Sequence, residues 1–394
     1  MASGKNKLRF MYEYLLTKLY QKSFGEDYVL NINRDLLNPQ QKKVLVIYIP
    51  KDFKIDFSSG IYHPNLTRSL QMISVLIKKG YAIDVFHTKG LNSFRYVQKS
   101  YDKIIGFGPL YEKVIESGVS GFPILFLTEN DPRAVKNKYQ ERIDYYKERH
   151  SDNAYTKSKS RDSFYSEKQL ELSKVCIAMN SSFNIANLHS LFNRVYTINV
   201  NGLYNTNFKF DINNAVRNKK NFVWFGSNGC IHKGLDILVD VFSQLPEYTL
   251  SIYGLPVYEY PIIKDKITHN IHYCGSINVF SDAFITEVIN KHCFVISASC
   301  SEGMNSGVAT CMRHGLIPVI TKEVGFEPHE SVIELNDYEV NSIREIIVKI
   351  CSYDAVTIQK MSESAYNYGN EAFRLIDFTN SFNDIITDIE TLSL

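Results

Sequence analysis

Short runs of almost wholly apolar residues recur along the chain, and they constrain the fold more than any other feature of the sequence. The run VLVIYI at 44–49 is typical, because it is apolar on both faces, as expected of a strand that is covered on both sides. We expect strands at 44–49, 83–87, 103–107, 124–128, 175–179, 194–200, 222–225, 249–253, 271–273, 294–296 and 317–320. Helical stretches separate most of these runs, which predicts parallel βαβ units and an α/β fold.

The chain has 394 residues, which is long for a single hydrophobic core and suits two domains. The pattern of strands and helices restarts after about residue 200. We therefore expect two Rossmann-like, doubly wound domains that face a cleft, preceded by an N-terminal helical extension. The expected boundaries are 1–40 for the extension, 41–200 for the first domain, 132–170 for a basic flexible insertion within it, 201–375 for the second domain and 376–394 for a last helix that packs back toward the first domain.

Composition argues against several classes of function. A net charge of +2 gives no overall attraction to nucleic acid, so no nucleic-acid partner is expected. The seven cysteines form no Cys-x-x-Cys pair and no cluster with zinc spacing, which predicts buried, reduced thiols and no metal site. The apolar runs fall short of the roughly 18 residues that span a membrane. Since Tyr12, Glu13 and Tyr14 also interrupt any signal-peptide core, we expect a cytoplasmic protein.

Two basic, tyrosine-containing segments each allow two interpretations. Residues 8–24 carry apolar and aromatic side chains at helical spacing among lysines. Such a helix can lie on an anionic membrane as a peripheral contact at the inner face, or it can pack on the domain behind it. Residues 132–170 are dense in Lys, Arg and Tyr, with almost no aliphatic core. They fit either a solvated helix at 135–148 with a flexible loop after it, or a basic flap that meets an anionic acceptor.

The segment at 294–321 combines two apolar runs, a polar turn and a helical pattern in the order strand, loop, helix, strand. Gly303 and Gly307 allow the loop backbone to approach a ligand, and Ser306 is expected to be the N-cap of the helix. The first amide hydrogens of this helix would face an anion, with Glu302 beside them as an acceptor for hydroxyl groups. This combination suits a sugar nucleotide.

A second ligand-binding loop is expected at 226–234, where the sequence GSNGCIHKG follows the first strand of the second half. Gly226 and Ser227 are small and leave space for a ligand. Lys233 supplies a positive charge for a phosphate group. A glycine-rich turn with a lysine is common, so this loop gains its meaning from the segment at 294–321, which follows about 70 residues later.

Loops at the carboxyl ends of parallel strands bind ligands in folds of this kind, which places several polar residues of the first half at one rim. Gly60 and His63 follow the first strand, and Glu129 follows the fourth. His63 can orient a sugar or a phosphate, or it is a solvated loop histidine. Glu129 is expected either to bind an acceptor or to cap the helix that follows it.

The run Ser301-Glu302-Gly303, a helix, and then the turn and strand at 315–320 resemble the donor-binding segment of GT-B glycosyltransferases, in particular the retaining nucleotide-sugar family called group 1. In that family a second Glu stands eight positions after the first and holds the ribose hydroxyls. This chain has Thr310 there, and one extra residue in the turn before Pro318. The resemblance covers about 221–321 with its motifs, and the first half by its strand pattern.

The loop at 226–234 also resembles that family. The family's Lys-Gly pair is kept as Lys233-Gly234, but Ser227 stands where the family has Arg. A protonated His232 can replace part of the missing charge. The resemblance further implies that the nucleotide base lies against the turn Gly275-Ser276-Ile277, that a Gly-rich loop of the first domain lies near the donor phosphates, and that the domains are joined at a hinge at 199–202.

The resemblance implies a glycosyltransferase that moves a sugar from a nucleotide-diphosphate donor to a glycan or lipid-linked acceptor, with retention of configuration and without metal or cofactor, in surface polysaccharide or glycoconjugate biosynthesis. The implied catalytic residues are Glu302, Lys233 and His63. The implied donor-binding residues are Gly226, Ser227, His232, Lys233, Ile277, Glu302, Asn305, Ser306, Gly307, Val308 and Thr310. The implied acceptor-side residues are Gly60, His63 and Glu129. Two alternatives stay open, a non-catalytic GT-B scaffold that binds glycan or a partner glycosyltransferase, and a sugar-nucleotide epimerase.

Overall fold

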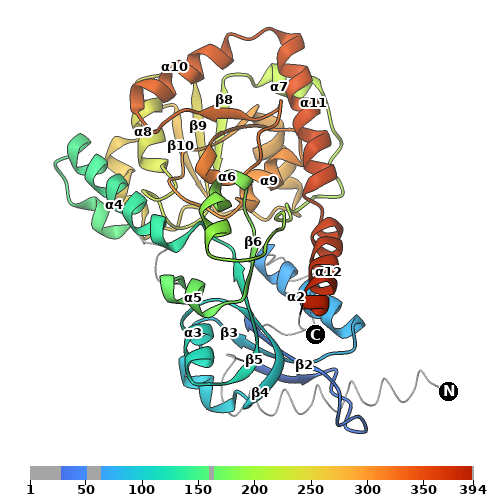
Figure 1. The fold of residues 1–394 in the computed structure, drawn as a ribbon. Helices are drawn as coiled ribbons and strands as arrows, with labels where there is room; N and C mark the ends of the chain where they lie inside the picture. The colour runs from blue at the N-terminus through green and yellow to red at the C-terminus, as the bar shows by residue number, and fades with distance from the viewer. Residues whose placement is uncertain (1–27, 51–63, 159–163, 393–394) are drawn as a thin grey trace.

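The computed structural model describes residues 28–50, 64–158 and 164–392, and these form two α/β domains with one sheet each (Figure 1). The helix expected at 8–24 lies outside the described residues, and so do Gly60 and His63. Within the described ranges, no helix has the length and apolar character needed to cross a membrane.

The first sheet has the strand order β1-β3-β2-β4-β5-β6-β7. Its described pairings are parallel except that of β1 with β3. β2 lies between β3 and β4 and is buried at every position after its first, which explains why its sequence is apolar on both faces. The strands are β1 (Tyr28–Ile32), β2 (Lys43–Tyr48), β3 (Ala82–His87), β4 (Ser100–Gly106), β5 (Ser120–Leu127), β6 (Val175–Ala178) and β7 (Val195–Thr197).

Residues 28–32 form the edge strand β1, which corrects the expectation that this part of the chain belongs to a helical extension. The Tyr28 ring is buried and stacks on Phe86 of β3 with a centroid distance of 5.4 Å. Asn31 and Asn33 have φ angles of 59° and 58°, so the backbone leaves the extended conformation here and the strand stays short. The strand therefore depends on a neighbour whose paired residues come 51 to 58 positions later in the sequence.

The second sheet has the strand order β10-β9-β8-β11-β12-β13, and its described pairings are all parallel. Its strands are β8 (Asn221–Phe225), β9 (Thr249–Tyr253), β10 (Ile271–Gly275), β11 (Phe294–Ser297), β12 (Ile317–Thr321) and β13 (Ile333–Leu335). β13 was not predicted, because three residues with one buried side chain do not make an apolar run.

Helices pack on the two sides of the second sheet. Figure 1 shows α8 and α10 on one side of β8 and β9, and α9 and α11 on the other; each of these pairs is in contact. The helices of the chain include α2 (Pro64–Lys78), α3 (Pro109–Glu116), α4 (Pro132–Arg149), α5 (Glu167–Leu172), α6 (Ser182–Ile185), α7 (Asn213–Arg217), α8 (Leu235–Ser243), α9 (Ser306–Met312), α10 (Val340–Cys351), α11 (Ala355–Ala372) and α12 (Leu375–Leu392).

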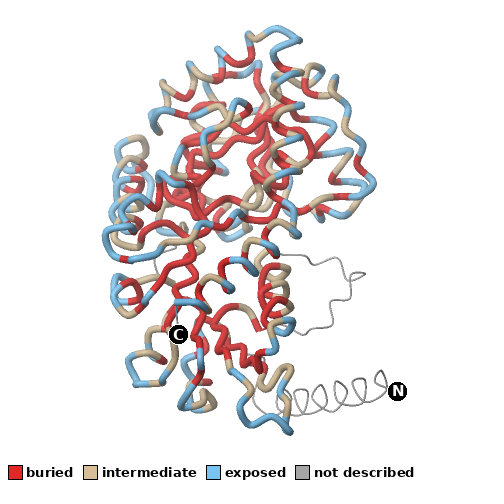
Figure 2. Tube along the Cα trace, turned by 45° about the vertical axis from the view of Figure 1, so that its right-hand side comes forward, coloured by how far each residue is buried: buried red, intermediate tan, exposed pale blue. Residues whose placement is uncertain are grey.

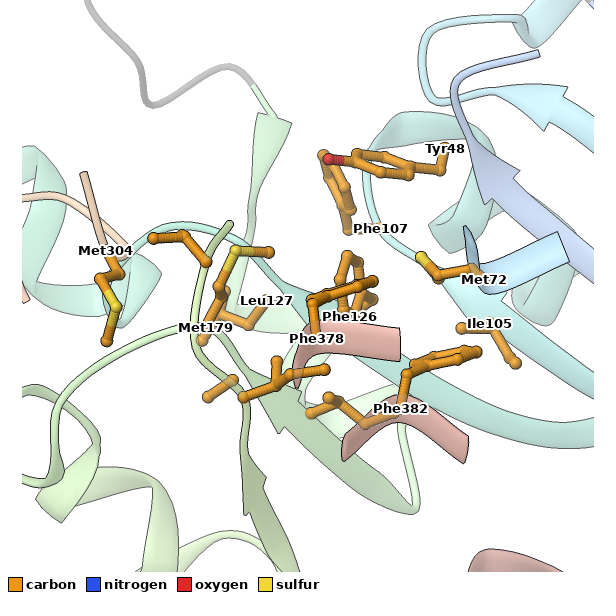
Figure 3. Packing of buried hydrophobic residues seen from close by; sticks show 14 of the residues in the cluster. Tyr48, Met72, Ile105, Phe107, Phe126, Leu127, Met179, Met304, Phe378 and Phe382 are labelled. Atoms are coloured by element: carbon orange, nitrogen blue, oxygen red, sulfur yellow. The ribbon is translucent and has the colours of Figure 1, made fainter. Parts of the chain in front are cut away.

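The last helix, α12, returns to the first domain and lies beside α2 (Figure 1). Lys79 and Tyr81, which follow α2, bind the Glu390 carboxylate at 3.2 Å and 2.7 Å. Phe378 and Phe382 of α12 are buried among the side chains of the first sheet (Figure 3). The end of the chain thus completes the core of the domain in which the chain begins.

The basic segment after β5 contains the helix that the sequence predicts at 135–148, as α4. This helix is packed, which corrects the expectation of a flexible insertion for residues 132–149. α4 belongs to the first domain by sequence, yet its buried face contacts the second domain. Arg142 donates from Nη2 to the backbone oxygen of Ala298 at 2.8 Å, and Arg149 forms an ion pair with Asp236 of α8. These two arginines therefore contribute to contacts between the domains, and a role of the segment toward an anionic acceptor stays a prediction.

Buried residues continue without interruption from one domain into the other (Figure 2). Met304, in a loop of the second domain, and Met179, directly after β6 of the first, belong to one cluster of buried side chains and lie near each other in Figure 3. The loops of the second sheet thus pack on the carboxyl ends of the first sheet, and their buried side chains share one core.

Candidate active site

The two loops that the sequence analysis identified leave neighbouring strands at the same edge of the second sheet. β8 and β11 pair in parallel, with Phe222 opposite Phe294. The loop at 226–234 follows β8 and the loop at 298–305 follows β11, so both begin at the carboxyl edge of the sheet. This edge is where open parallel sheets bind their ligands.

Lys233 and Glu302 meet between these loops in an ion pair between Nζ and Oε1, although 69 positions separate them in the sequence. Their side chains are only 5% and 6% exposed. The Oε1 of Glu302 also lies 3.5 Å from the hydroxyl of Ser299 and 3.5 Å from the Nδ2 of Asn305, and both groups donate to it. The structure therefore brings together the cation and the acid that the sequence assigned to one ligand.

His232 is buried and joins the two loops. Its Nε2 donates to the backbone oxygen of Ser301, and its own backbone oxygen accepts from the Cys300 amide at 2.9 Å and from the Ser299 hydroxyl at 3.2 Å. Burial raises the pKa of the Cys300 thiol to about 12, so this thiol stays protonated and is no nucleophile at neutral pH. The phosphate contact predicted for His232 stays a prediction. It would require the imidazole to give up its hydrogen bond to the Ser301 backbone oxygen.

Glu259 holds the loop at 226–234 in shape. This carboxylate is buried, and its Oε2 accepts from the amides of Gly229 at 2.8 Å and Cys230 at 3.0 Å. An acid of the protein itself thus binds the amide hydrogens of Gly229 and Cys230, which lie four and three positions before Lys233 in this loop. Glu259 was not predicted as a site residue, because it lies 30 positions after Gly229 and belongs to no motif. The available signal was a lone acid in the apolar surroundings GLPVYEYPII.

Asn305 is the N-cap of α9, which corrects the expectation that Ser306 takes this position. The Oδ1 of Asn305 accepts from the amides of Gly307 at 2.9 Å and Val308 at 3.2 Å. Two of the amide hydrogens that were expected to face an anion are therefore used inside the cap. The Ser306 hydroxyl instead accepts a hydrogen bond from the Nη1 of Arg68, in the first domain, at 3.0 Å.

Thr310, at the position of the family's second Glu, uses its hydroxyl in the connection between the domains. Its Oγ1 donates to the Ser306 backbone oxygen at 2.7 Å and accepts from the Leu203 amide at 3.0 Å. One turn later, His314 accepts at Nε2 from the Asn205 amide at 3.1 Å. Burial lowers the pKa of His314 to about 4, so its imidazole is neutral and can accept this bond. The nucleotide contact of Thr310 stays a prediction that requires these bonds to change.

The loop that carries Glu302 packs on the carboxyl rim of the first sheet. A Cβ on Gly303 would lie 2.4 Å from the backbone oxygen of Thr128, at the end of β5, so only glycine fits there. Asn180, which follows β6, donates from Nδ2 to the backbone oxygen of Glu302 at 3.1 Å. The candidate site is therefore bounded by residues of both domains.

Glu129 lies on the same rim and is buried. The following helix, α4, has Asp131 as its N-cap, with the Arg133 amide donating to this carboxylate at 3.0 Å. The capping interpretation of Glu129 is therefore wrong, and its role toward an acceptor stays a prediction.

The remaining predicted donor-binding residues lie near the edge of the second sheet. Gly226 follows β8 and is half-buried, and its amide donates to the Tyr253 backbone oxygen at 3.1 Å. Ser227 is exposed, and Ile277, after β10, is half-buried against the core. These positions are compatible with the predicted roles and do not test them.

No family model matches the sequence, and no curated protein matches it. Solved structures do match. Sucrose-phosphate synthase (tll1590) from Thermosynechococcus elongatus is 11% identical with a TM-score of 0.60, over 90% of this chain and 100% of that one. Anabaena Alr3699/HepE in complex with UDP and glucose is 14% identical with a TM-score of 0.56, over 89% and 100%. TarM is 13% identical with a TM-score of 0.51, over 74% and 57%. These similarities confirm the two-domain GT-B fold that the sequence predicts.

Proposed function

We propose that this chain is a glycosyltransferase that moves a sugar from a nucleotide-diphosphate donor to a glycan or lipid-linked acceptor. The observation that supports this most is the buried pair of Lys233 and Glu302 at the carboxyl edge of the second sheet. The fold that holds this pair is shared with sucrose-phosphate synthase and with HepE, and HepE binds UDP and glucose in its structure. A uridine diphosphosugar is therefore the first donor to test.

The pair suits the two ends of such a donor. The ammonium of Lys233 would stabilise the negative charge that develops on the diphosphate as it leaves, a type of contact whose loss typically costs about 10²–10³ in rate. The carboxylate of Glu302 would accept hydrogen bonds from hydroxyl groups of the sugar. Because both side chains are buried, water screens neither contact strongly.

Donor binding must exchange the partners of both charges. Without a donor, the ammonium and the carboxylate neutralise each other, and Ser299 and Asn305 also hold the carboxylate. A diphosphosugar offers phosphate oxygens to the ammonium and hydroxyl hydrogens to the carboxylate, so each charge keeps a partner when the two separate. Removing either side chain leaves the other as an uncompensated buried charge, which is strongly unfavourable.

The finer features of the reaction belong to the same proposal. Transfer would occur with retention of configuration, by front-side attack assisted by the leaving phosphate. It would occur without a metal, since the chain has no Asp-x-Asp pair. The acceptor would approach from the first domain, where Glu129 lies on the rim of the sheet. We place the enzyme in surface polysaccharide or glycoconjugate biosynthesis, in the cytoplasm or at the inner face of the membrane.

A non-catalytic GT-B scaffold is the second candidate, and two observations favour it. Thr310 gives its hydroxyl to the connection between the domains, so the ribose lacks the acceptor that the resembling family provides. Glu259 binds amide hydrogens of the loop at 226–234 that would otherwise be available to phosphate. A scaffold would fold as this chain does and would bind no nucleotide.

Isothermal titration with UDP, GDP and CMP distinguishes the two candidates. The enzyme is expected to bind at least one of these nucleotides, and a screen of the corresponding sugar nucleotides for hydrolysis then identifies the donor. Absence of binding to all three by the folded protein would favour the scaffold. The Lys233→Ala variant tests whether the nucleotide binds at the proposed site. If this variant binds the nucleotide as tightly as wild type does, the nucleotide binds elsewhere on the protein.

A further inference from the structure

Arg68 is a buried cation that the predicted site does not include. It lies on α2 of the first domain and is only 3% exposed. Its Nη1 donates to the Ser306 hydroxyl of the second domain at 3.0 Å, and its Nη2 contacts the Oδ1 of Asn65. Its Nε has no hydrogen-bond partner among the described residues. A guanidinium with five donors is thus buried between the domains with part of its capacity unused.

Arg68 belongs to the same polar cluster as the candidate catalytic pair. Ser306 directly follows Asn305, whose Nδ2 lies 3.5 Å from the Oε1 of Glu302. Glu302 in turn forms the ion pair with Lys233. The cluster therefore contains two cations and one carboxylate, and each cation comes from a different domain.

The charge balance of this cluster indicates a missing anion. Within the part of the chain that the structure describes, no carboxylate lies at ion-pair distance from Arg68. Its polar neighbours there are Ser306, Asn65 and the buried hydroxyl of Tyr48, and all three are neutral. Burying an uncompensated charge is costly, so such a site favours an anionic ligand. The planar fork of a guanidinium matches the oxygens of a phosphate group, to which it can donate two parallel hydrogen bonds.

We propose that Arg68 binds the diphosphate of the nucleotide donor, opposite Lys233, and so supplies positive charge from the first domain. The proposal rests on the proposed function for the identity of the ligand. Arg68 would be a binding residue that exchanges its neutral partner Ser306 for phosphate oxygens. Because α2 and α9 belong to different domains, the donor would then be bound fully only when the two domains are in contact.

The test compares Arg68→Gln with Lys78→Gln, which removes one positive charge from an exposed position on the same helix. Isothermal titration measures the affinity for UDP, GDP and CDP, and for inorganic diphosphate as a probe without a nucleoside. We expect Arg68→Gln to bind the best nucleotide and inorganic diphosphate roughly 10- to 100-fold more weakly, the range for losing a hydrogen bond to a charged group. Lys78→Gln should bind both like wild type.

Arg68→Lys separates binding from structure. If the charge contacts phosphate, the lysine variant should recover part of the lost affinity for both ligands. If Arg68 has a purely structural role, its replacement should instead lower the melting temperature of the ligand-free protein. The affinities for the nucleotide and for diphosphate should then fall by unrelated factors. Should Arg68→Gln fail to fold, the lysine variant and wild type decide alone: equal affinity for diphosphate in these two proteins would overturn the inference, since lysine cannot form the two parallel bonds.

The outcomes also separate this inference from the proposed function. Unchanged nucleotide affinity in Arg68→Gln overturns the inference and leaves the glycosyltransferase proposal intact. Binding of inorganic diphosphate that depends on Arg68, without binding of any nucleotide, supports an anion site and contradicts the nucleotide donor. A wild-type protein that binds neither nucleotide nor diphosphate contradicts both.

Discussion

Replacing Glu259 by Ala tests whether this buried carboxylate shapes the loop that carries Lys233. In the structure, the carboxylate accepts from the Gly229 amide at 2.8 Å and 3.1 Å, and from the Cys230 amide at 3.0 Å. Alanine removes every one of these acceptors and leaves two buried amide hydrogens without a partner. The loop would then have to open or admit water, and Lys233 would lose its fixed position beside Glu302.

The expected cost follows from these contacts. A buried donor left unsatisfied costs about 1–3 kcal/mol, so the two amides together predict a loss of about 2–6 kcal/mol in the free energy of unfolding. Relief from burying the carboxylate offsets part of this, which places our expectation at about 2–4 kcal/mol. Glu259→Gln keeps one oxygen acceptor and should lose about half as much. The exposed Asp265→Asn is the control, and it should change stability by less than about 0.5 kcal/mol.

Equilibrium unfolding in urea, followed by tryptophan fluorescence, measures this loss directly. The chain has one tryptophan, Trp224, which is buried in β8 immediately before the loop, so its emission reports on this domain. Isothermal titration with UDP should show weaker binding by Glu259→Ala than by Asp265→Asn. If Glu259→Ala unfolds at the same urea concentration as wild type and binds UDP equally well, the carboxylate does not organise the loop and our reading of it is wrong.

Three further predictions concern packing and pH. His314 has a pKa lowered to about 4, below the ordinary 6.5, so the unfolded chain binds protons first and stability is lost as pH falls from about 6.5 toward 4. By pH 5 the His314 share should cost about 2 kcal/mol relative to pH 7. His314→Gln, measured by urea unfolding at both pH values, should remove this share and leave the shares of His150 and His292, whose pKa values burial also lowers to about 4; an unchanged difference between the two pH values contradicts it. Arg149→Gln should lower the free energy of unfolding by about 3 kcal/mol, because the buried Asp236 loses its ion-pair partner, and Asp236→Asn in the same chain should restore part of it; a single variant as stable as wild type would refute the pairing. Gly303→Ala should push the domains apart, because the added Cβ would lie 2.4 Å from the backbone oxygen of Thr128. Small-angle scattering should show a larger radius of gyration, and an unchanged radius of gyration would contradict this prediction.

The parallel core of both domains was predictable because strands buried on both faces must be apolar throughout. The elements that escaped prediction lack this signal. β1 is an antiparallel edge strand, and β13 has only three residues. The segment between β10 and β11, which the structure describes throughout, has no regular α-helix, because it forms a π-helical turn at Phe284–Val288 and a short 3-10 turn after it. The capping error at α9 is one residue, because Asn305 and Ser306 both suit the position and sequence alone does not decide between them.

The residues of the candidate site also fall into those that the sequence could predict and those that it could not. Lys233 and Glu302 could be identified because each follows a strand inside a local motif, and parallel strands deliver both to one edge. Arg68 acts on a residue 238 positions away, so no local pattern reveals it. One signal was present: Arg68 shares a helix face with Met72 and Val75, where a charged residue is out of place unless it has a partner.

The rate of sugar-nucleotide turnover by Lys233→Ala and Glu302→Ala tests the central claim most directly, with the exposed Lys360→Ala as the control. If both side chains act on one diphosphosugar, each variant should lose about 100-fold in rate while it remains folded, and the double variant should lose much less than the product of the two. Lys360→Ala should turn over donor like wild type. Folded Lys233→Ala and Glu302→Ala proteins with wild-type rates would contradict the account.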